Sequence, residues 1–455
     1  MRLASRALTR PRSWDESHSL TGTNPTVSPS VSVVVETLYP RRALGLLAEH
    51  LDNARVVVVN GPRQSGKSEL LRMAHHDRGG RYLSLDTPAD LRLARNDPTG
   101  LATTPDRPLF IDEVQRGGDP LVLAIKAAVD NDRERGQFAL AGSTRFLTEP
   151  RLSESLAGRA RFVDLWPLAQ GEIERREHGD AFVDLLFSGL DAVVDSSPIG
   201  ERRPAVVERL TRGGFPEAVL STSQRARRSF FDDYVRTISQ RDITELSRIT
   251  QRVDFASVLR LVAAHTSSEL NTTNLANDAR LGTETMRRYL PLLEAVFMCW
   301  RLPAWSVNLT SKVVQRPKLH IVDPGLAAAL VGVSAEALAT PVHPADGQLL
   351  ETMVACEIAK QLTWAADTYR MYHWRSRDGR EIDIVVERAD GMIAGIEVKA
   401  AVDVDTHDLR HLTWMRDRLG TRWAGGVLVH LGDRARHWGP GLASLPINAL
   451  WQVSA

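Results

Sequence analysis

The residues best suited to chemistry lie in one short stretch, VVVVNGPRQSGKSELLRM, where an apolar run ends and a helical pattern begins. Gly61, four further residues and then Gly66, Lys67 and Ser68 match the pattern of a phosphate-binding loop. Glycines let the backbone curl so that its N–H groups point at phosphate oxygens, and the following helix adds the positive end of its dipole. We expect Gly61 and Gly66 to shape this loop. Lys67 would reach the β- and γ-phosphates, and Ser68 would ligate Mg²⁺.

Two acids close a second apolar run, RPLFIDEVQ, which places Asp112 and Glu113 at the end of a predicted strand. Ligand and metal groups of open α/β sheets gather at the carboxyl ends of the strands. We expect Asp112 to hold Mg²⁺ through water, and Glu113 to orient and deprotonate the attacking water. Together with a phosphate loop, these acids indicate nucleotide chemistry.

Two later motifs offer further groups for a phosphate. In FALAGSTRFL, Ser143 or Thr144 would hydrogen-bond the γ-phosphate, and a hydroxyl that caps the next helix is the alternative. In SLAGRARF, Arg159 would stabilise the charge of the phosphoryl group in transfer. The alternatives for Arg159 are an ordinary surface arginine and an arginine that acts on a neighbouring chain.

The motifs GPRQSGKS, LFIDEVQ, LAGSTR, SLAGR and GGFPE follow one another in this order. In these motifs the chain resembles the bacterial and archaeal AAA-type ATPases whose C-terminal half is a domain of unknown function, DUF4143. The resemblance covers roughly residues 38 to 430 and implies Glu113 as the catalytic residue. It also implies that Mg-ATP is bound by Gly66, Lys67, Ser68 and Asp112. It supports a fold and a nucleotide, and it leaves the pathway open.

A second acidic pattern lies near the end of the chain, in EIDIVVERADGMIAGIEVKA. Because side chains alternate along a strand, Glu381 and Asp383 share one face of the first strand. By the same rule Glu397 and Lys399 share one face of the second strand. The Asp-Gly turn between the two strands predicts a β-hairpin. Asp383 and Glu397 would then share a Mg²⁺ ion, with Lys399 orienting a water or stabilising a phosphorane.

This pattern resembles the PD-(D/E)XK nuclease fold, in which Asp383, Glu397 and Lys399 match the core motif. An upstream helix, GQLLETMVACEIAKQL, would add Glu351 or Glu357 to the metal site. A fold does not by itself imply cleavage. Binding of DNA or of a protein without cleavage is the alternative.

The middle of the chain carries a helix-turn-helix pattern. NTTNLANDARL predicts a short helix, Gly282 a turn, and TETMRRYLPLLEAV a second helix that begins at Thr283. The apolar VFMCWRL that follows would start a β-wing. The second helix would offer Thr285, Arg287 and Arg288 to DNA. A winged-helix fold used only for packing or protein contacts is the alternative.

A further amphipathic helix is predicted in SQRARRSFFDDYVRTISQRDITEL. Phe230, Tyr234 and Ile238 fall on one stripe of this helix. Its arginines either contact phosphate backbones or pair with the neighbouring aspartates on a solvated face.

The type of secondary structure predicted to position these groups differs between the parts of the chain. Strand-like and helical runs alternate up to WPLAQGEIERREHG, which predicts parallel βαβ units with helices on both faces of a sheet. We expect an α/β protein with a P-loop AAA-type parallel-sheet domain, a helical winged-helix-like middle and an α/β nuclease-like C-terminal domain. The expected boundaries are 1–33 for a disordered tail, 34–190 for the P-loop ATPase core, 191–222 for a helical lid or connector, 223–338 for the winged-helix-like region and 345–455 for the nuclease-like domain.

The composition is that of a soluble globular protein, with 43% hydrophobic and 25% charged residues among 455. The 57 basic and 56 acidic residues give a net charge of +1, so nucleic-acid binding must use a local basic surface. No apolar run approaches the roughly 20 residues of a membrane helix. Two cysteines without zinc-ligand spacing suit a reducing cytosol. The Arg-rich start MRLASRALTRPRSW fits a disordered tail or a mitochondrial presequence.

These patterns predict a cytoplasmic ATP-binding protein that requires Mg²⁺. It would be a slow ATPase that couples nucleotide state to DNA or protein binding by its C-terminal domains. One alternative is a nucleotide-gated DNA- or protein-binding switch with little hydrolysis. Another is an ATP-regulated, metal-dependent nuclease in a defence or toxin-like role. The expected cofactors are ATP and Mg²⁺, and the expected partners are DNA, a protein or further copies of the chain, without a membrane.

Overall fold

The structure, a computed structural model, describes residues 39–142, 156, 158–176, 180–242, 254–306, 315–340 and 343–454. The chain divides into two units, Met1–Tyr39 and Pro40–Ala455, and every element below belongs to the second unit. The predicted tail, residues 1–33, lies outside the described residues. Among the described residues, no helix combines the length and the apolar character needed to cross a membrane.

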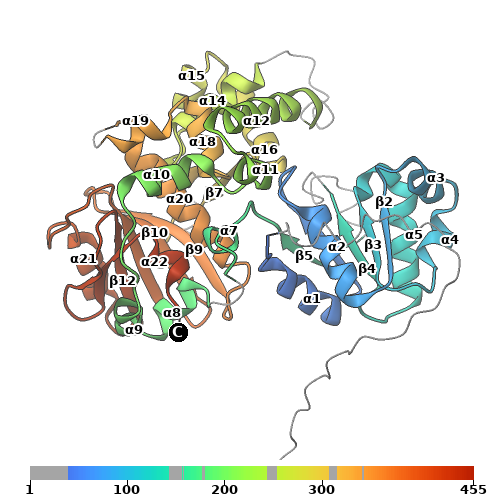
Figure 1. The fold of residues 1–455 in the computed structure, drawn as a ribbon, viewed down its shortest axis with the longest axis horizontal. Coiled ribbons are helices and arrows are strands. Elements are labelled where there is room, and N and C mark those ends of the chain that lie inside the picture. Colours follow the sequence, from blue (N-terminus) through green and yellow to red (C-terminus); the bar gives the residue numbers. More distant parts are fainter. Residues whose placement is uncertain are drawn as a thin grey trace, which may run out of the picture. The chain divides into compact units, whose positions relative to one another are not determined.

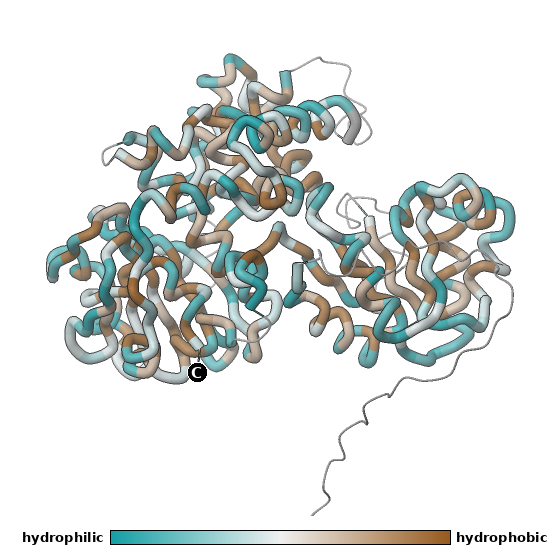
Figure 2. The backbone as a smooth tube through the Cα atoms, viewed as in Figure 1, coloured by the Kyte–Doolittle hydropathy of each residue, from teal (hydrophilic) through white to brown (hydrophobic). Residues whose placement is uncertain are grey.

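The first sheet has five parallel strands in the order β2-β3-β4-β1-β5 (Figure 1). Its elements are α1 (Ala43–Asn53), β1 (Val56–Asn60), α2 (Lys67–Arg78), β2 (Arg81–Ser84), α3 (Pro88–Asn96), α4 (Pro98–Ala102), β3 (Leu109–Asp112), the 3-10 helix η2 (Val114–Gly117), α5 (Gly118–Asn131), β4 (Phe138–Ala141) and β5 (Ala160–Asp164). Val56 and Val58 pack into a buried cluster with α5, whereas Val57 and Val59 pack into another with α1 and α2. Helices therefore cover both faces, which confirms the predicted parallel α/β domain. Figure 2 shows the hydrophobic stretches of these strands.

Helices dominate the next part of the chain. They are α7 (Gln170–Ile173), α8 (Phe182–Ser188), α9 (Leu190–Asp195), α10 (Arg203–Arg212), α11 (Pro216–Leu220), α12 (Gln224–Thr237), the π-helix η4 (Ile238–Asp242), α14 (Phe255–Ala264), α15 (Thr272–Asp278), α16 (Thr283–Ala295), α18 (Pro324–Val331) and α19 (Ala335–Ala339). A small antiparallel sheet in the order β6-β8-β7 lies among them. Its strands are β6 (Ser268–Glu269), β7 (Cys299–Leu302) and β8 (Lys318–Ile321).

The C-terminal sheet is mixed and has six strands in the order β13-β14-β12-β11-β10-β9. Its elements are α20 (Asp346–Gln361), β9 (Tyr369–Arg375), β10 (Glu381–Arg388), β11 (Ile393–Val398), α21 (Arg410–Leu419), the 3-10 helix η5 (Gly420–Arg422), β12 (Trp423–His430), β13 (Arg436–His437), β14 (Leu442–Pro446) and α22 (Ala449–Gln452). Strands β10 and β11 pair antiparallel, which confirms the predicted hairpin. Ile396 shares a buried cluster with α20, whereas Ile393 packs with α21 on the other face.

Helices α8 and α9 lie around residue 190, where the P-loop core was expected to end, but they pack against the C-terminal sheet. Val183 and Leu186 lie in the same buried cluster as Val354 of α20 and Val427 of β12. The α8 helix contacts both of those elements. An apolar helical stripe does not identify the sheet that it covers, so the sequence pattern alone could not assign these two helices. Residues 182–195 belong with the C-terminal sheet.

Candidate nucleotide site and acidic centre

The predicted phosphate loop joins the end of β1 to the start of α2. Gly61 has a φ of 154°, and a Cβ atom on it would lie 2.3 Å from the carbonyl oxygen of Leu165. Gly66 has a φ of 95°, in the left-handed region where other side chains are strained. Both positions therefore favour glycine. The loop leads directly into the N-terminus of α2, where backbone N–H groups favour an anion.

Lys67 and Ser68 are the first two residues of α2. The side chain of Lys67 is buried, and its Nζ donates hydrogen bonds to the carbonyl oxygens of Gly61, at 2.9 Å, and Pro62, at 2.7 Å. The ammonium group therefore lies against the loop, close to where phosphate oxygens would meet the loop N–H groups. Ser68 offers a hydroxyl oxygen, a hard donor of the kind that Mg²⁺ prefers.

Asp112 and Glu113 stand at the carboxyl end of β3. Asp112 is buried and accepts hydrogen bonds from the Tyr82 hydroxyl, at 3.2 Å, and from the Glu113 N–H, at 3.1 Å. Glu113 has a φ of 53°, an uncommon conformation for a residue other than glycine and one that is found at functional sites. Gln115 Nε2 donates to Glu113 Oε2. Burial raises the pKa of the Glu113 carboxyl, and the nearby Lys67 ammonium opposes that rise.

A cavity of about 410 Å³ opens beside these groups. It is lined by Arg63, Gln64, Gly66, Lys67, Ser68, Glu69 and Glu113, and on the other side by Phe230, Asp233, Tyr234 and Thr237 of α12. Its size is within the range of ligand pockets. The Tyr234 hydroxyl donates to the carbonyl oxygen of Arg63 in the loop, at 3.3 Å. The sequence pattern placed Phe230 and Tyr234 on one helical stripe but did not link that stripe to the phosphate loop.

Arg41 is a second contributor that the sequence pattern missed. It precedes α1, is only 9% exposed, and lies at the back of the loop. One guanidinium nitrogen donates to the carbonyl oxygen of Ser65 at 2.6 Å, and the other donates to that of Trp166 at 2.7 Å. Its Nε lies 3.4 Å from a carboxylate oxygen of Glu172. Arg41 thus ties the phosphate loop to the segment that follows β5.

Family comparisons agree with this geometry. Residues 53–174 match the family model of an AAA domain, and residues 346–450 match that of a domain of unknown function, DUF4143. The chain carries an AAA domain followed by a DUF4143 domain. Between them, residues 203–337 match DUF8612, a further domain of unknown function. The phosphate loop and the Asp112–Glu113 strand end both lie within the AAA match, in agreement with the resemblance that the motifs carry.

Individual relatives were found as well. Uncharacterised proteins of Mycobacterium bovis and Mycobacterium tuberculosis are each 28% identical over 397 residues, which are 85% of this chain and 80% of each relative. Among solved structures, the Walker-type ATPase of Pyrococcus abyssi is 16% identical and has a TM-score of 0.40. That match covers 67% of this chain and 99% of the other.

Two predicted residues of the AAA domain remain, Ser143 and Arg159. Ser143, like Thr144, lies outside the described residues. Arg159 precedes β5, and the register pairs Ala160 with Val56 at the start of β1. A strand of five residues, about 16 Å long, therefore separates it from the phosphate loop at the other end of β1. Arg159 instead binds both carboxylate oxygens of Asp130, away from the phosphate loop of its own chain, and its action on the phosphate of a neighbouring chain stays a prediction.

In the DUF4143 domain, the acids of the hairpin surround a lysine that the sequence pattern missed. Lys318 Nζ lies 2.7 Å from Glu351 Oε1, 2.7 Å from Glu381 Oε1 and 3.2 Å from Asp383 Oδ1. Glu381 and Asp383 therefore share one side of β10, as alternation predicted. Burial alone would lower the pKa of Lys318, but Asp383, Glu351 and Glu381 together raise it, so the ammonium stays charged. We call Lys318, Glu351, Glu381 and Asp383, with Glu397, the acidic centre.

Glu397 lies on β11 opposite Asp383, as the pairing of Ile384 with Ile396 requires. Its carboxyl is buried, and burial together with the Asp383 carboxylate raises its pKa to about 8. Among the described residues, Glu397 Oε1 has no hydrogen-bond partner. Lys399 follows β11, and its backbone N–H donates to the carbonyl oxygen of Val429.

Glu357, the other acid offered by the α20 pattern, lies elsewhere. Its carboxylate accepts the backbone N–H of Gln170, at 3.1 Å, next to Lys360, whose Nζ donates to the carbonyl oxygen of Leu168. Glu351 and Glu357 are six residues apart, and at about 100° per residue their side chains point in directions that differ by about 120°. They therefore lie on different sides of α20. Glu351 joins the acidic centre, and Glu357 instead contacts the segment that leaves the AAA domain.

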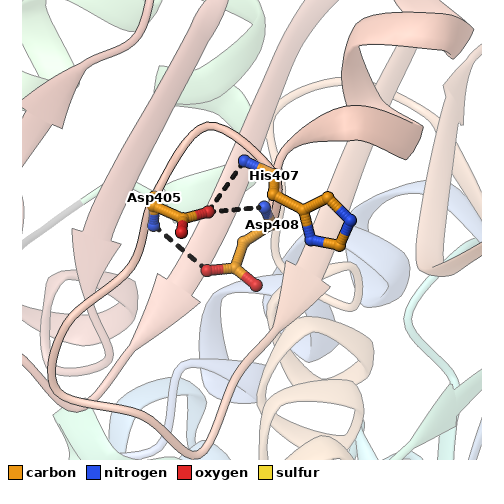
Figure 3. Close-up of side chains that lie close together, drawn as sticks. All are labelled: Asp405, His407 and Asp408. Atoms are coloured by element: carbon orange, nitrogen blue, oxygen red, sulfur yellow. Dashed lines mark hydrogen bonds between the residues drawn. The ribbon is translucent and has the colours of Figure 1, made fainter.

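A group of three side chains before α21 contains residue types that can bind a metal ion. Among the described residues, only Asp405, His407 and Asp408 bring three potential ligand atoms within 4.8 Å of one another (Figure 3). Asp405 Oδ1 accepts the N–H groups of His407 and Asp408, and Asp408 Oδ2 accepts that of Asp405. These bonds close the turn before α21. They account for the grouping without an ion, because such side-chain-to-backbone bonds are usual in turns.

Proposed function

We propose that this chain is a Mg²⁺-dependent ATPase whose nucleotide state is passed to the helical region through α12. The observation that carries this proposal is the cavity between the phosphate loop and α12. It brings together a buried lysine, a helix N-terminus and a carboxylate on one side, and Phe230, Tyr234 and Thr237 on the other. Polyphosphate suits the first set, because backbone N–H groups and an ammonium both stabilise its charge.

The proposed roles follow from position. Gly61 and Gly66 allow the loop to curl, and Lys67 would exchange its carbonyl partners for β- and γ-phosphate oxygens. The Ser68 hydroxyl and the Asp112 carboxylate supply hard oxygen donors, which fit Mg²⁺. When bound, Mg²⁺ would neutralise charge on the transferring phosphate.

Glu113 is proposed to orient and deprotonate the attacking water. Its carboxyl lines the cavity, and burial moves its pKa toward neutrality, which suits a general base. Gln115 Nε2 binds one of its oxygens. That contact favours a second candidate, a nucleotide-gated switch with little hydrolysis, because it occupies one oxygen of the proposed base.

The coupling route runs through Tyr234. Its hydroxyl contacts the loop at Arg63, and its ring packs on Phe215 with centroids 4.9 Å apart. Phe215 is fully buried in the cluster that extends through the helical region to the DUF4143 domain. A movement of the loop would therefore displace the packed side chains of this cluster. Close-packed interiors transmit such strain.

The proposed partner of the helical region is DNA. The order α14-β6-α15-α16-β7-β8, with β8 between β6 and β7, supports the predicted winged-helix arrangement. Arg287 and Arg288 are exposed on α16, and Arg287 is paired only loosely with Glu284, at 3.6 Å. Exposed arginines on the second helix are suited to phosphates and base edges in a major groove. Binding of a protein by the same face is the alternative outcome.

Binding of ATP tests the first step of this proposal. We expect Lys67→Ala to weaken affinity for a fluorescent ATP analogue by about 10-fold to 100-fold, the scale of a lost charge-assisted hydrogen bond. Lys126→Ala, on α5 of the same domain, is the matched control and should bind as the parent does. Equal affinity of the Lys67→Ala variant and the parent would refute the site.

A further inference from the structure

Lys318 reaches the acidic centre from outside the DUF4143 domain. It is the first residue of β8, the middle strand of the small sheet, and lies within residues 203–337, which match DUF8612. Its side chain is 2% exposed. The three acids that it meets come from two other elements, Glu351 from α20 and Glu381 and Asp383 from β10. One buried cation thus joins three elements.

The ammonium has the right number of donors for its surroundings. Lysine carries three N–H donors, and three carboxylate oxygens lie within 3.2 Å of Nζ. The second oxygen of Asp383 accepts the backbone N–H of Val398, at 3.0 Å. Both oxygens of Asp383, one of the two acids that the nuclease resemblance assigns to a metal, therefore already have donors.

The arrangement also differs from a preformed metal site. Metal ligands converge on one point, and Mg²⁺–oxygen distances are about 2.1 Å. No three acids of the acidic centre place ligand atoms within 4.8 Å of one another, as judged over the described residues. The ammonium group of Lys318 instead lies between the carboxylates of Glu351, Glu381 and Asp383. Within the part of the chain that the structure describes, the buried Oε1 of Glu397 has no hydrogen-bond partner, and it lies 3.7 Å from His411 Nδ1.

We propose that Lys318 Nζ occupies the cation position of the acidic centre, so that this centre takes no divalent ion in the native chain. The Mg²⁺ ion that the nuclease resemblance implies does not fit beside it. Removal of the ammonium leaves Glu351, Glu381 and Asp383 as oxygen donors around the position that Nζ vacates, and carboxylate oxygens are the ligand class of Mg²⁺ and Mn²⁺. The DUF8612 region therefore blocks a divalent-cation site in the DUF4143 domain.

Binding of Mn²⁺ to the nucleotide-free full chain tests this proposal, with the free ion counted by electron paramagnetic resonance. We expect Lys318→Met to bind one more Mn²⁺ per chain than the parent, and Asp383→Asn in that background to abolish the gain. Lys360→Met is the matched control, because Lys360 is another buried lysine that faces a carboxylate, Glu357, at 3.9 Å. It should gain no ion.

Two results would overturn the proposal. One is Mn²⁺ binding by the parent chain that Asp383→Asn removes, because the site would then be open with Lys318 in place. The other is a folded Lys318→Met variant that gains no ion. If Lys318→Met alone does not fold, Lys318→Met with Glu381→Gln removes one excess charge and carries the same prediction. The parent measurement needs no lysine variant. Ions at the phosphate loop are excluded because Asp383→Asn leaves the residues of that loop unchanged.

Discussion

At the scale of single residues, the candidate nucleotide site depends on side chains that hold the loop as well as on those that would touch phosphate. Arg41 donates to Ser65 in the loop and to Trp166 beyond β5. Loops that bind anions work by preorganised N–H groups, and preorganisation is lost when the supporting contacts are removed. Arg41 is therefore a positioning residue for the phosphate loop.

Arg41→Ala should weaken ATP affinity about tenfold, or ~1.4 kcal/mol, because the loop then loses two charge-assisted hydrogen bonds. Isothermal titration with ATP and Mg²⁺ measures the change. Arg92→Ala is the control, since that side chain is exposed on α3 of the same domain and does not line the cavity. Unchanged affinity in Arg41→Ala, with the fold intact by circular dichroism, would remove Arg41 from the site.

Glu357 predicts a pH dependence of stability. Burial raises the pKa of its carboxyl to about 6 from 4.5, so the folded chain binds more protons than the unfolded chain between these values. The contribution of this group to stability is therefore full below about pH 4.5 and falls as pH rises through about 6. Glu357→Gln keeps an acceptor for Gln170 and cannot ionise.

At pH 7.5, Glu357→Gln should be more stable to urea than the parent by up to about 2 kcal/mol, which is the shift of about 1.5 pKa units converted to free energy. At pH 4.5 the two should differ little. A difference that is the same at both pH values would contradict the protonation argument.

At the scale of elements, α12 is the part of the helical region that meets the phosphate loop. Bound ATP should slow amide hydrogen exchange in residues 224–237, because nucleotide in the cavity would bridge the loop and the helix. Residues 203–212 of α10 do not line the cavity and serve as the internal control. The slowing should be absent in Lys67→Ala. Slowing in α12 that persists in that variant would show that the effect does not come from the phosphate loop.

Helix α16 predicts a salt-dependent DNA contact. Arg287→Ala with Arg288→Ala should weaken binding to duplex DNA and lower the slope of log affinity against log salt by about 1.8, or about 0.9 for each phosphate contact. Fluorescence anisotropy between 50 and 200 mM salt, roughly the range over which such contacts weaken, measures both. Arg225→Ala with Arg228→Ala, on α12, is a control of equal charge. An equal loss of DNA affinity in both double variants would show that binding depends on overall positive charge and not on a specific contact by α16.

The elements that follow from local pattern were predictable, and the contacts between distant segments were not. The phosphate loop, the Asp112–Glu113 strand end and the β10–β11 hairpin each follow from a few consecutive residues. Lys318 meets acids 33 and 65 residues away, and Tyr234 meets a carbonyl 171 residues away. Such pairings depend on how the elements pack, which no local periodicity contains. Likewise, the sequence did not show which face of α20 meets the hairpin, and it therefore could not choose between Glu351 and Glu357.

At the scale of the whole molecule, the AAA domain leads into the DUF4143 domain through a buried polar junction. Gln170 donates to Glu357, and Lys360 donates to Leu168. With α12 on the phosphate loop, this junction is a second physical link between the nucleotide site and the C-terminal half. Coupling through two links requires a change of nucleotide state, and hydrolysis of ATP is the change that the proposed function supplies.

ATP turnover by the full chain tests the central claim most directly. The parent should hydrolyse ATP only with Mg²⁺, and Glu113→Gln should keep ATP affinity while its turnover falls by about 100-fold or more, as expected for loss of a general base. Gln115→Ala, which frees Glu113 from a hydrogen bond, should not lower turnover. A parent chain that binds Mg-ATP without turnover, or a Glu113→Gln variant as active as the parent, would contradict the account.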